Sequence, residues 1–331
     1  MSKSPHNFAL VPARRRRPEW LSAAGANHMP VIFLQSRDGS KRFWEYFTAH
    51  IRNRNTRHAY FVAVSQFSDW CLKRKLILEH VQPIHVASYI EELGLVRSKP
   101  TVKQHLAAIR MLFDWLVVGH VIEVNPAHAV RGPKHVVKKG RTPVLDRDEA
   151  RALLAVIDPS LLTGLRDRAL IGTMIYTFAR IGAVLQMNVG DYYSEGRRGW
   201  VRVHEKGGKE HAAPCHHKLE AFLDGYIAAA GIAADQEGAL FRTTGRRTGG
   251  AHRMTQADAY RMIERRARAA GIKTKVGNHS LRATGITDYL NSGGTLEHAQ
   301  AMANHSSPRT TKLYDRRADE VGLDEYERVG I

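Results

Sequence analysis

The sequence of residues 279–314 is HSLRATGITDYLNSGGTLEHAQAMANHSSPRTTKLY, and its pattern is helical throughout. It begins with His279 and Arg282, three residues apart, and ends with His305 and, nine residues later, Tyr314. Two histidines, an arginine and a tyrosine that meet on short helices can form a phosphate site with a nucleophile at its edge. We therefore predict that this segment carries the function of the chain.

The His-x-x-Arg pair is weak evidence by itself. With 18 histidines among 331 residues and many arginines, composition alone predicts roughly two such pairs, and two are present. The second pair, His128 and Arg131, lies in a proline-flanked connector without companions. The pair at 279 gains weight only from the polar residues that accompany it.

Composition indicates a two-domain protein with a polyanionic partner. The 331 residues are 43% hydrophobic, which is enough for two cores, and the formal net charge is +18. Residues 1–141 contain 23 Lys and Arg against 9 Asp and Glu, so most of the excess is N-terminal. Such a charge favours nucleic acid over a membrane, and it predicts that the N-terminal part is the main clamp on a phosphate backbone.

The cysteine content and the apolar runs exclude several classes. Only Cys71 and Cys215 are present, far apart, so neither a disulfide framework nor a zinc site is predicted, and a reducing cytoplasm fits. We expect no signal peptide and no membrane span, since no apolar run approaches about 18 residues. Arg14 to Arg17 belong to a basic N-terminal arm, residues 1–35.

The pattern predicts a helical domain over residues 36–130. Ser40, Thr56 and Thr101 are expected to start helices, and Gly94 and Gly119 to end them, which gives a four-helix bundle with a basic exterior. Residues 131–143 contain two prolines, two glycines and five basic residues without helical period, as an interdomain linker does. Candidate DNA contacts in these segments are Arg52, Arg54, Arg57, Lys99, Lys103, Arg110, Lys138 and Lys139.

A second domain is predicted over residues 144–331. Asp146 is expected to cap its first helix, and a buried helix from about 165 to 178 leads to Arg180, whose guanidinium should emerge from the interior. Segments 200–204 and 211–214 alternate around a Gly-Gly turn and predict a β-hairpin that carries Lys206. Thr255 should cap a helix whose Arg261 and Arg265 are further candidate DNA contacts. The predicted fold class is mainly α with this small β element.

Six polar residues in this order resemble the tyrosine recombinase, or phage integrase, family. They are Arg180, Lys206, His279, Arg282, His305 and Tyr314. The segment Ala303-Asn304-His305-Ser306-Ser307, followed by Thr310-Thr311 and Tyr314, is similar to the family's Gly-His-Ser segment and Thr-Thr-x-x-Tyr ending. In the first domain, Thr56-Arg57-x-x-Tyr60 and Asn125-Pro126-Ala127 look like the family's helical, SAM-like core-binding domain. The resemblance covers about residues 40–318.

The resemblance implies a site-specific recombinase that cleaves and rejoins DNA without metal, ATP or other cofactor. Tyr314 would attack a phosphodiester to form a 3′-phosphotyrosyl link, while Arg180 and Arg282 would hold the nonbridging oxygens. His305 would hold a nonbridging oxygen, and Lys206 would protonate the leaving 5′-oxygen. His279 would accept the phenolic proton or bond the phosphate.

Two positions depart from the family pattern, and one alternative lysine remains. Ala183 occupies a position that is usually acidic, where a carboxylate would orient the active-site histidine. Asn304 stands where glycine is common. Lys209 competes with Lys206 for the lysine role, and Lys206 is preferred because it aligns with the first lysine of the family's hairpin motif.

The resemblance also implies partners and an assembly. The two domains would form a C-shaped clamp on double-stranded DNA, and four copies would exchange strands through a Holliday junction at specific sites. The tail, residues 315–331, would dock on a neighbouring copy, and the scheme allows for accessory proteins. Alternative functions are a catalytically silent DNA-binding protein on this fold, and a type IB topoisomerase or telomere resolvase. A helix-turn-helix regulator would leave Lys206 and Tyr314 without purpose.

Overall fold

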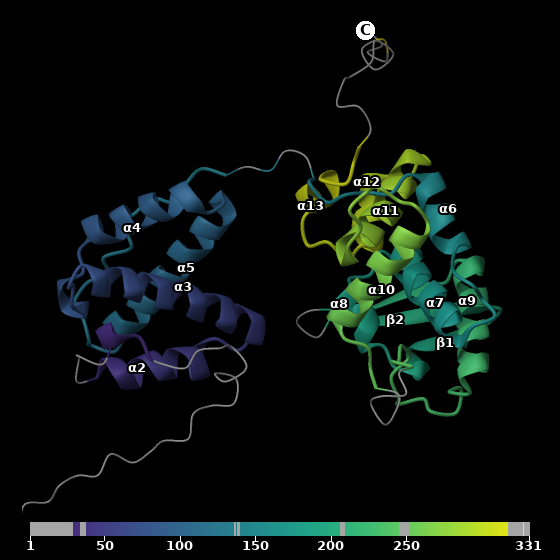
Figure 1. Ribbon diagram of the computed structural model, residues 1–331, viewed down its shortest axis with the longest axis horizontal. Helices are drawn as coiled ribbons and strands as arrows, with labels where there is room; N and C mark the ends of the chain where they lie inside the picture. The colour runs from purple at the N-terminus through teal and green to yellow at the C-terminus, as the bar shows by residue number, and fades with distance from the viewer. Residues whose placement is uncertain are drawn as a thin grey trace, which may run out of the picture. The chain divides into compact units, whose positions relative to one another are not determined.

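The computed structural model describes residues 29–33, 38–135, 137, 140–205, 209–244, 252–316 and 327. The chain divides into two compact units, Met1–Val136 and Val137–Ile331 (Figure 1). Most of the basic arm, Lys138, Lys139, Lys206 and most of the tail were singled out from the sequence and lie outside the described residues. Residues 29–33 of the arm are described, and Ile32 and Phe33 are buried in the core of the first unit.

The first unit is helical. It contains the 3-10 turns η1 (Val31–Phe33) and η3 (Leu78–His80), the π-helical turn η2 (Tyr46–His50), and helices α2 (Gly39–Glu45), α3 (Arg54–Lys73), α4 (Pro83–Val96) and α5 (Lys99–Val118). Its core is rich in aromatic rings in edge-to-face contact, such as Phe43 with Phe47 at 5.0 Å and Phe47 with Phe61 at 5.4 Å between centroids. Such pairs add stabilisation beyond the apolar area that they bury.

Four of the predicted helix boundaries in this unit are wrong. Helix α5 begins at Lys99, directly after Ser98, and not at Thr101. Asp38, rather than Ser40, precedes the first turn of α2, because the Ser40 hydroxyl donates to a carbonyl of η1 at 2.9 Å. Asn53 caps α3, with its side-chain oxygen accepting from two backbone N–H groups, including that of Thr56 at 3.0 Å. Helix α4 continues past Gly94, whose position is exposed and has no side chain nearby.

The second unit combines a small antiparallel sheet with a group of helices. The strands β1 (Tyr192–Glu195), β2 (Arg198–Glu205) and β3 (Lys209–Pro214) pair in the order β1-β2-β3. The helices are α6 (Arg147–Ala155), α7 (Leu162–Thr177), α8 (Ile181–Gln186), the 3-10 turn η4 (Val189–Asp191), α9 (His217–Ala230), α10 (Gln256–Ala269), α11 (Asn278–Asn291), α12 (Leu296–Met302) and α13 (Pro308–Lys312). None of the described helices is long and apolar enough to cross a membrane.

Local signals predict this unit well. Asp146 caps α6 by accepting from the N–H of Glu149 at 2.7 Å, and Thr255 caps α10. The hairpin is confirmed, with Glu205 opposite Lys209, but the third strand β1 was not predicted. Residues 279–314 are not helical throughout, because turns at 292–295 and 303–307 divide them into three helices.

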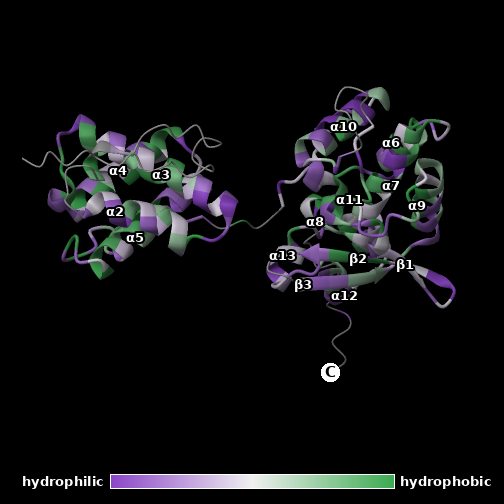
Figure 2. Cartoon of the chain, turned by 90° about the horizontal axis from the view of Figure 1, so that it is seen from below, coloured by the Kyte–Doolittle hydropathy of each residue, from purple (hydrophilic) through white to green (hydrophobic). Residues whose placement is uncertain are grey.

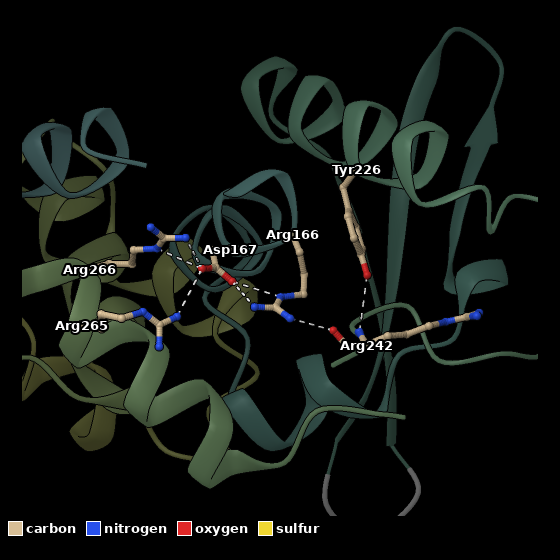
Figure 3. Close-up of polar contacts among 6 residues, drawn as sticks. All are labelled: Arg166, Asp167, Tyr226, Arg242, Arg265 and Arg266. Carbon is tan, nitrogen blue, oxygen red and sulfur yellow. Dashed lines mark hydrogen bonds and ion pairs between the residues drawn. The ribbon is translucent and has the colours of Figure 1, made fainter. Parts of the chain in front are cut away.

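A buried ion cluster joins α7 to α10. Asp167 is fully buried and accepts from Arg166 at 2.7 Å and from Arg266 at 2.8 Å, with Arg265 at 3.9 Å (Figure 3). A buried carboxylate is tolerated only with such partners. Helix α10 is otherwise largely hydrophilic (Figure 2). Asp167 therefore fixes the polar helix that precedes α11, the helix of His279 and Arg282.

Close helix packing depends on Gly285 of α11. A Cβ at this position would lie 2.1 Å from the carbonyl oxygen of Ile175 on α7. By contrast, a Cβ at Gly225 of α9 would meet only Leu165, at an ordinary 3.7 Å. The backbones of α7 and α11 can approach this closely only because residue 285 has no side chain.

We predict that Gly285→Ala lowers the free energy of unfolding by about 1–3 kcal/mol, because α11 must move away from α7. Gly225→Ala is the matched control and should be neutral or stabilise by up to about 1 kcal/mol, since alanine favours a helix. Denaturant unfolding of both variants measures the difference. Equal effects of the two substitutions would contradict the close-packing argument.

Candidate active site

The corner between α7 and α8 places Arg180. Helix α7 ends at Thr177, and Phe178 adopts the left-handed conformation, with φ at 55°. Arg180 is then the N-cap residue of α8, with its side chain 40% exposed. The sequence prediction that this guanidinium emerges from the interior is correct. Left-handed backbone is unfavourable for a bulky residue, so the buried surroundings of Phe178 must stabilise the corner.

Arg282 lies at the centre of the site and is only 2% exposed. Its guanidinium donates to the carbonyl oxygens of Phe178 and, at 2.6 Å, Ala303, and to Nε2 of His305 at 2.7 Å. Burial, followed by the charge of Arg180, lowers the pKa of Arg282 to about 10. This value is still well above 7, and the guanidinium is therefore charged at neutral pH. One side chain thus connects α11 with the ends of α7 and α12.

His305 has a fixed protonation pattern. Since Nε2 accepts from Arg282, Nδ1 carries the proton and donates to the Thr311 hydroxyl at 2.9 Å. Asn304, which replaces a common glycine, has φ at 46°. Asparagine is among the few residues other than glycine that tolerate this conformation, so the departure is compatible with the turn.

Tyr314 follows α13 and lies beside His305. The two rings are stacked, with centroids 5.8 Å apart and planes 9° from parallel. The Thr287 hydroxyl donates to the carbonyl oxygen of Tyr314 at 2.9 Å, and Gly140 N–H donates to that of Leu313 at 3.1 Å. The tyrosine segment is therefore held from α11 on one side and from residue 140 on the other.

His279, at the start of α11, is the more exposed of the two histidines. Partial burial, with the positive charges of Arg282 and Arg180, lowers its pKa from the ordinary value. It is therefore predominantly neutral at pH 7, as a proton acceptor must be.

The hairpin contributes a residue that sequence reasoning missed. Glu205, the last residue of β2, forms an ion pair with Nη1 of Arg180, and its side chain is only 7% exposed. Its position directly before Lys206 was the only available signal, because the pairing crosses 25 residues of sequence. Lys206 itself lies outside the described residues, so the structure brings together five of the six predicted residues.

The predicted DNA-contact residues have different surroundings. Arg52, Arg54, Lys99 and Lys103 are exposed. The guanidinium groups of two others bond to backbone carbonyls of their own domain: that of Arg57 to Ile51 at 2.7 Å and that of Arg110 to Ala127 at 3.0 Å. Arg261 and Arg265 on α10 are exposed but lie within reach of Asp258 and Asp167, respectively.

Two further features of the second unit concern ligands. A cavity of about 700 Å³ between α6, α7, α9 and α11 is lined by residues such as Arg147, Arg168, Phe222 and Asp288, and by none of the five site residues. Within the described ranges, no group of three or more histidine, cysteine or carboxylate side chains is arranged to hold a metal ion.

Two guanidiniums, two imidazoles and a phenol thus share one site, which suits an anionic phosphate diester beside a nucleophile. Comparison with known proteins agrees. Residues 143–320 match the phage integrase family, and residues 41–119 match the N-terminal SAM-like domain of phage integrases. The chain belongs to the phage integrase family.

Relatives and solved structures cover most of the chain. It is 27% identical over 268 residues to the tyrosine recombinase XerC of Thermodesulfovibrio yellowstonii, which covers 78% of this chain and 85% of the relative. The fold is similar to that of the XerH site-specific recombinase bound to its difH substrate, with a TM-score of 0.64, 22% identity and coverage of 82% and 78%. The fold is also similar to that of a lambda integrase tetramer bound to a Holliday junction, with a TM-score of 0.64 and 17% identity. That match covers 92% of this chain and 86% of the lambda integrase chain.

Burial of His305 predicts a pH dependence of stability. Burial, followed by the charges of Arg282 and Arg180, lowers its pKa to about 4, whereas an unfolded histidine titrates near about 6.5. Between these values the unfolded chain binds a proton that the folded chain does not, so stability falls as the pH falls from about 6.5 towards 4. The folded protein is favoured above this window.

We expect the wild type to lose about 1–2 kcal/mol more unfolding free energy than His305→Gln between pH 7 and pH 5. Glutamine has both a donor and an acceptor but does not titrate. Denaturant unfolding of both proteins at the two pH values measures this difference, and identical pH dependence would show that His305 titrates normally.

Proposed function

We propose that this protein is a site-specific DNA recombinase that cleaves and rejoins strands through a covalent tyrosine intermediate. The observation that supports the proposal most strongly is the chain of interactions from Arg282 to His305 at 2.7 Å and from His305 to the stacked ring of Tyr314. A buried arginine needs an anion or several acceptors, and here it lies beside a potential nucleophile.

In the proposed reaction, the Tyr314 hydroxyl attacks the scissile phosphorus and the bond to the 5′-oxygen breaks. His279 accepts the phenolic proton, and Lys206 supplies a proton to the 5′-oxygen. Arg180 and Arg282 stabilise the charge that develops on the nonbridging oxygens. The product is a 3′-phosphotyrosyl link, which a 5′-hydroxyl of another strand opens by the reverse steps. The free energy of the phosphodiester bond is retained.

Access to Arg282 requires a local rearrangement. This side chain is only 2% exposed and interacts directly with the side chain of Tyr314. A phosphate that binds Arg282 must therefore share or displace the tyrosine interaction, and the short helix α13 with its flanking turns is the segment that would move. In this proposal the resting site is closed, and DNA opens it.

The proposal extends to partners and location. Its substrate is double-stranded DNA with specific sites, which both domains would contact, in a reducing cytoplasm. Four copies would act together on two sites, since a lambda integrase tetramer bound to a Holliday junction has a similar fold. The domain boundaries that we propose are residues 1–35 for the N-terminal arm, 36–130 for the helical DNA-binding domain, 131–143 for the linker and 144–331 for the catalytic domain.

Covalent trapping tests the central step. With a nicked suicide substrate of flanking DNA in EDTA, wild type should form a protein–DNA adduct that survives SDS, and Tyr314→Phe should form none because it lacks the nucleophile. DNA binding by the two proteins should be equal, which controls for folding. Binding without an adduct on a verified site would favour a silent DNA-binding protein, and relaxation of supercoiled plasmid without paired sites would favour a topoisomerase.

Salt dependence tests the basic surface of the first unit. Lys99→Gln with Lys103→Gln should weaken DNA binding and reduce the slope of log affinity against log salt by about 1 for each phosphate that a lysine no longer neutralises. Arg110→Met is the comparison, because Arg110 bonds to carbonyls of its own domain and should mainly affect stability. An unchanged slope in the double lysine variant would rule out phosphate binding by these two lysines.

A further inference from the structure

Glu205 has an unusual position for a carboxylate. It ends β2 opposite Lys209 of β3, and only 7% of its side chain is exposed. Burying a carboxylate costs free energy unless a cation or several donors compensate it. Its cationic partner is Arg180, whose side chain is 40% exposed. The carboxylate therefore lies on the inner side of the pair, and the guanidinium faces outward.

The geometry of the pair leaves Arg180 available. Glu205 contacts Nη1, and the other two guanidinium nitrogens bond to no group in the described parts of the chain. Glu205 therefore occupies one of the three guanidinium nitrogens and leaves the other two as donors for an anion.

No acidic residue of α8 can do this. The helix sequence is IGAVLQ, and Ala183, one turn after Arg180, is buried among apolar side chains. The surroundings are strongly positive. The charge of Arg180 lowers the pKa of Arg282, and both arginines lower the pKa of His279. Glu205 supplies negative charge to this cluster from the sheet, in the absence of an acid on α8.

We propose that Glu205 is a positioning residue for Arg180: it fixes the guanidinium against the end of β2 and directs its free nitrogens to the scissile phosphate. This inference rests on the proposed function. Because Glu205 directly precedes Lys206, the end of one strand would orient the first arginine and carry the hairpin lysine.

The test is single-turnover cleavage of the suicide substrate at saturating DNA, together with the dissociation constant of the complex. Glu205→Gln should lower the cleavage rate by about 10- to 100-fold, because misplacing a group by a small distance has effects of this size. DNA affinity should change by less than about threefold. Glu210→Gln is the matched control: Glu210 lies on β3, pairs with His204, and its side chain is 64% exposed. Its rate should equal that of wild type.

A double-mutant cycle separates positioning from general stability. In an Arg180→Lys background, Glu205→Gln should have little further effect, because the group that it positions is already changed. If Glu205→Gln unfolds at a lower temperature than wild type, Glu205→Asp replaces it in the same cycle. Aspartate keeps the charge on a shorter side chain. The proposal would be overturned if the rate reductions of the two substitutions multiply in the cycle, or if Glu205→Gln cleaves at the wild-type rate. Faster cleavage by Glu205→Gln would also overturn it and would identify Glu205 as a competitor of phosphate.

The outcome is distinguishable from failure of the proposed function. If wild type forms no adduct, the recombinase proposal itself fails. If wild type forms the adduct and Glu205→Gln forms it equally fast, only the role of Glu205 fails.

Discussion

Burial of the Arg282 guanidinium is the constraint on which the second unit depends. A charge with 2% exposure must have acceptors at fixed positions, and two separate segments provide them: the end of α7, and the turn after α12 that contains Ala303 and His305. The acceptors are held in turn by close packing at Gly285 and by the Thr311 bond to His305. The same contacts therefore hold the Arg282 guanidinium and the core of the unit.

Two left-handed residues provide the turns that this arrangement needs. Phe178 and Asn304 have φ values of 55° and 46°, and each lies within two residues of a site residue, Arg180 or His305. Non-glycine residues adopt this conformation at a free-energy cost, which surrounding contacts must offset. The phenylalanine is buried in a small cluster with Ile286 and Leu290, next to the Tyr314 ring, so the same packing supports both turns and the tyrosine.

Charge is balanced locally despite the net charge of +18. Asp167 is buried among arginines of α7 and α10, and Glu205 is buried and paired with Arg180. Neither partnership is visible in the sequence, because the paired residues are adjacent or far apart without any periodic relation. By contrast, the caps at Asp146 and Thr255 were predicted, since a cap is an interaction within four residues. The wrong helix starts predicted at Ser40 and Thr56 show the limit of capping patterns. A nearby asparagine can provide the cap instead, or the expected cap residue can bond to a distant carbonyl.

The sequence by itself determined the family, the helical character of both units, the hairpin and the order of six polar residues, because these depend on local pattern and on residue identity. The tertiary structure decided which polar atoms meet: the Arg282 bond to His305, the tautomer of that histidine, the stacking on Tyr314 and the carboxylate of Glu205. These features depend on distances between segments up to 104 residues apart, such as Phe178 and Arg282. Such distances are set by packing, and no short stretch of sequence specifies them.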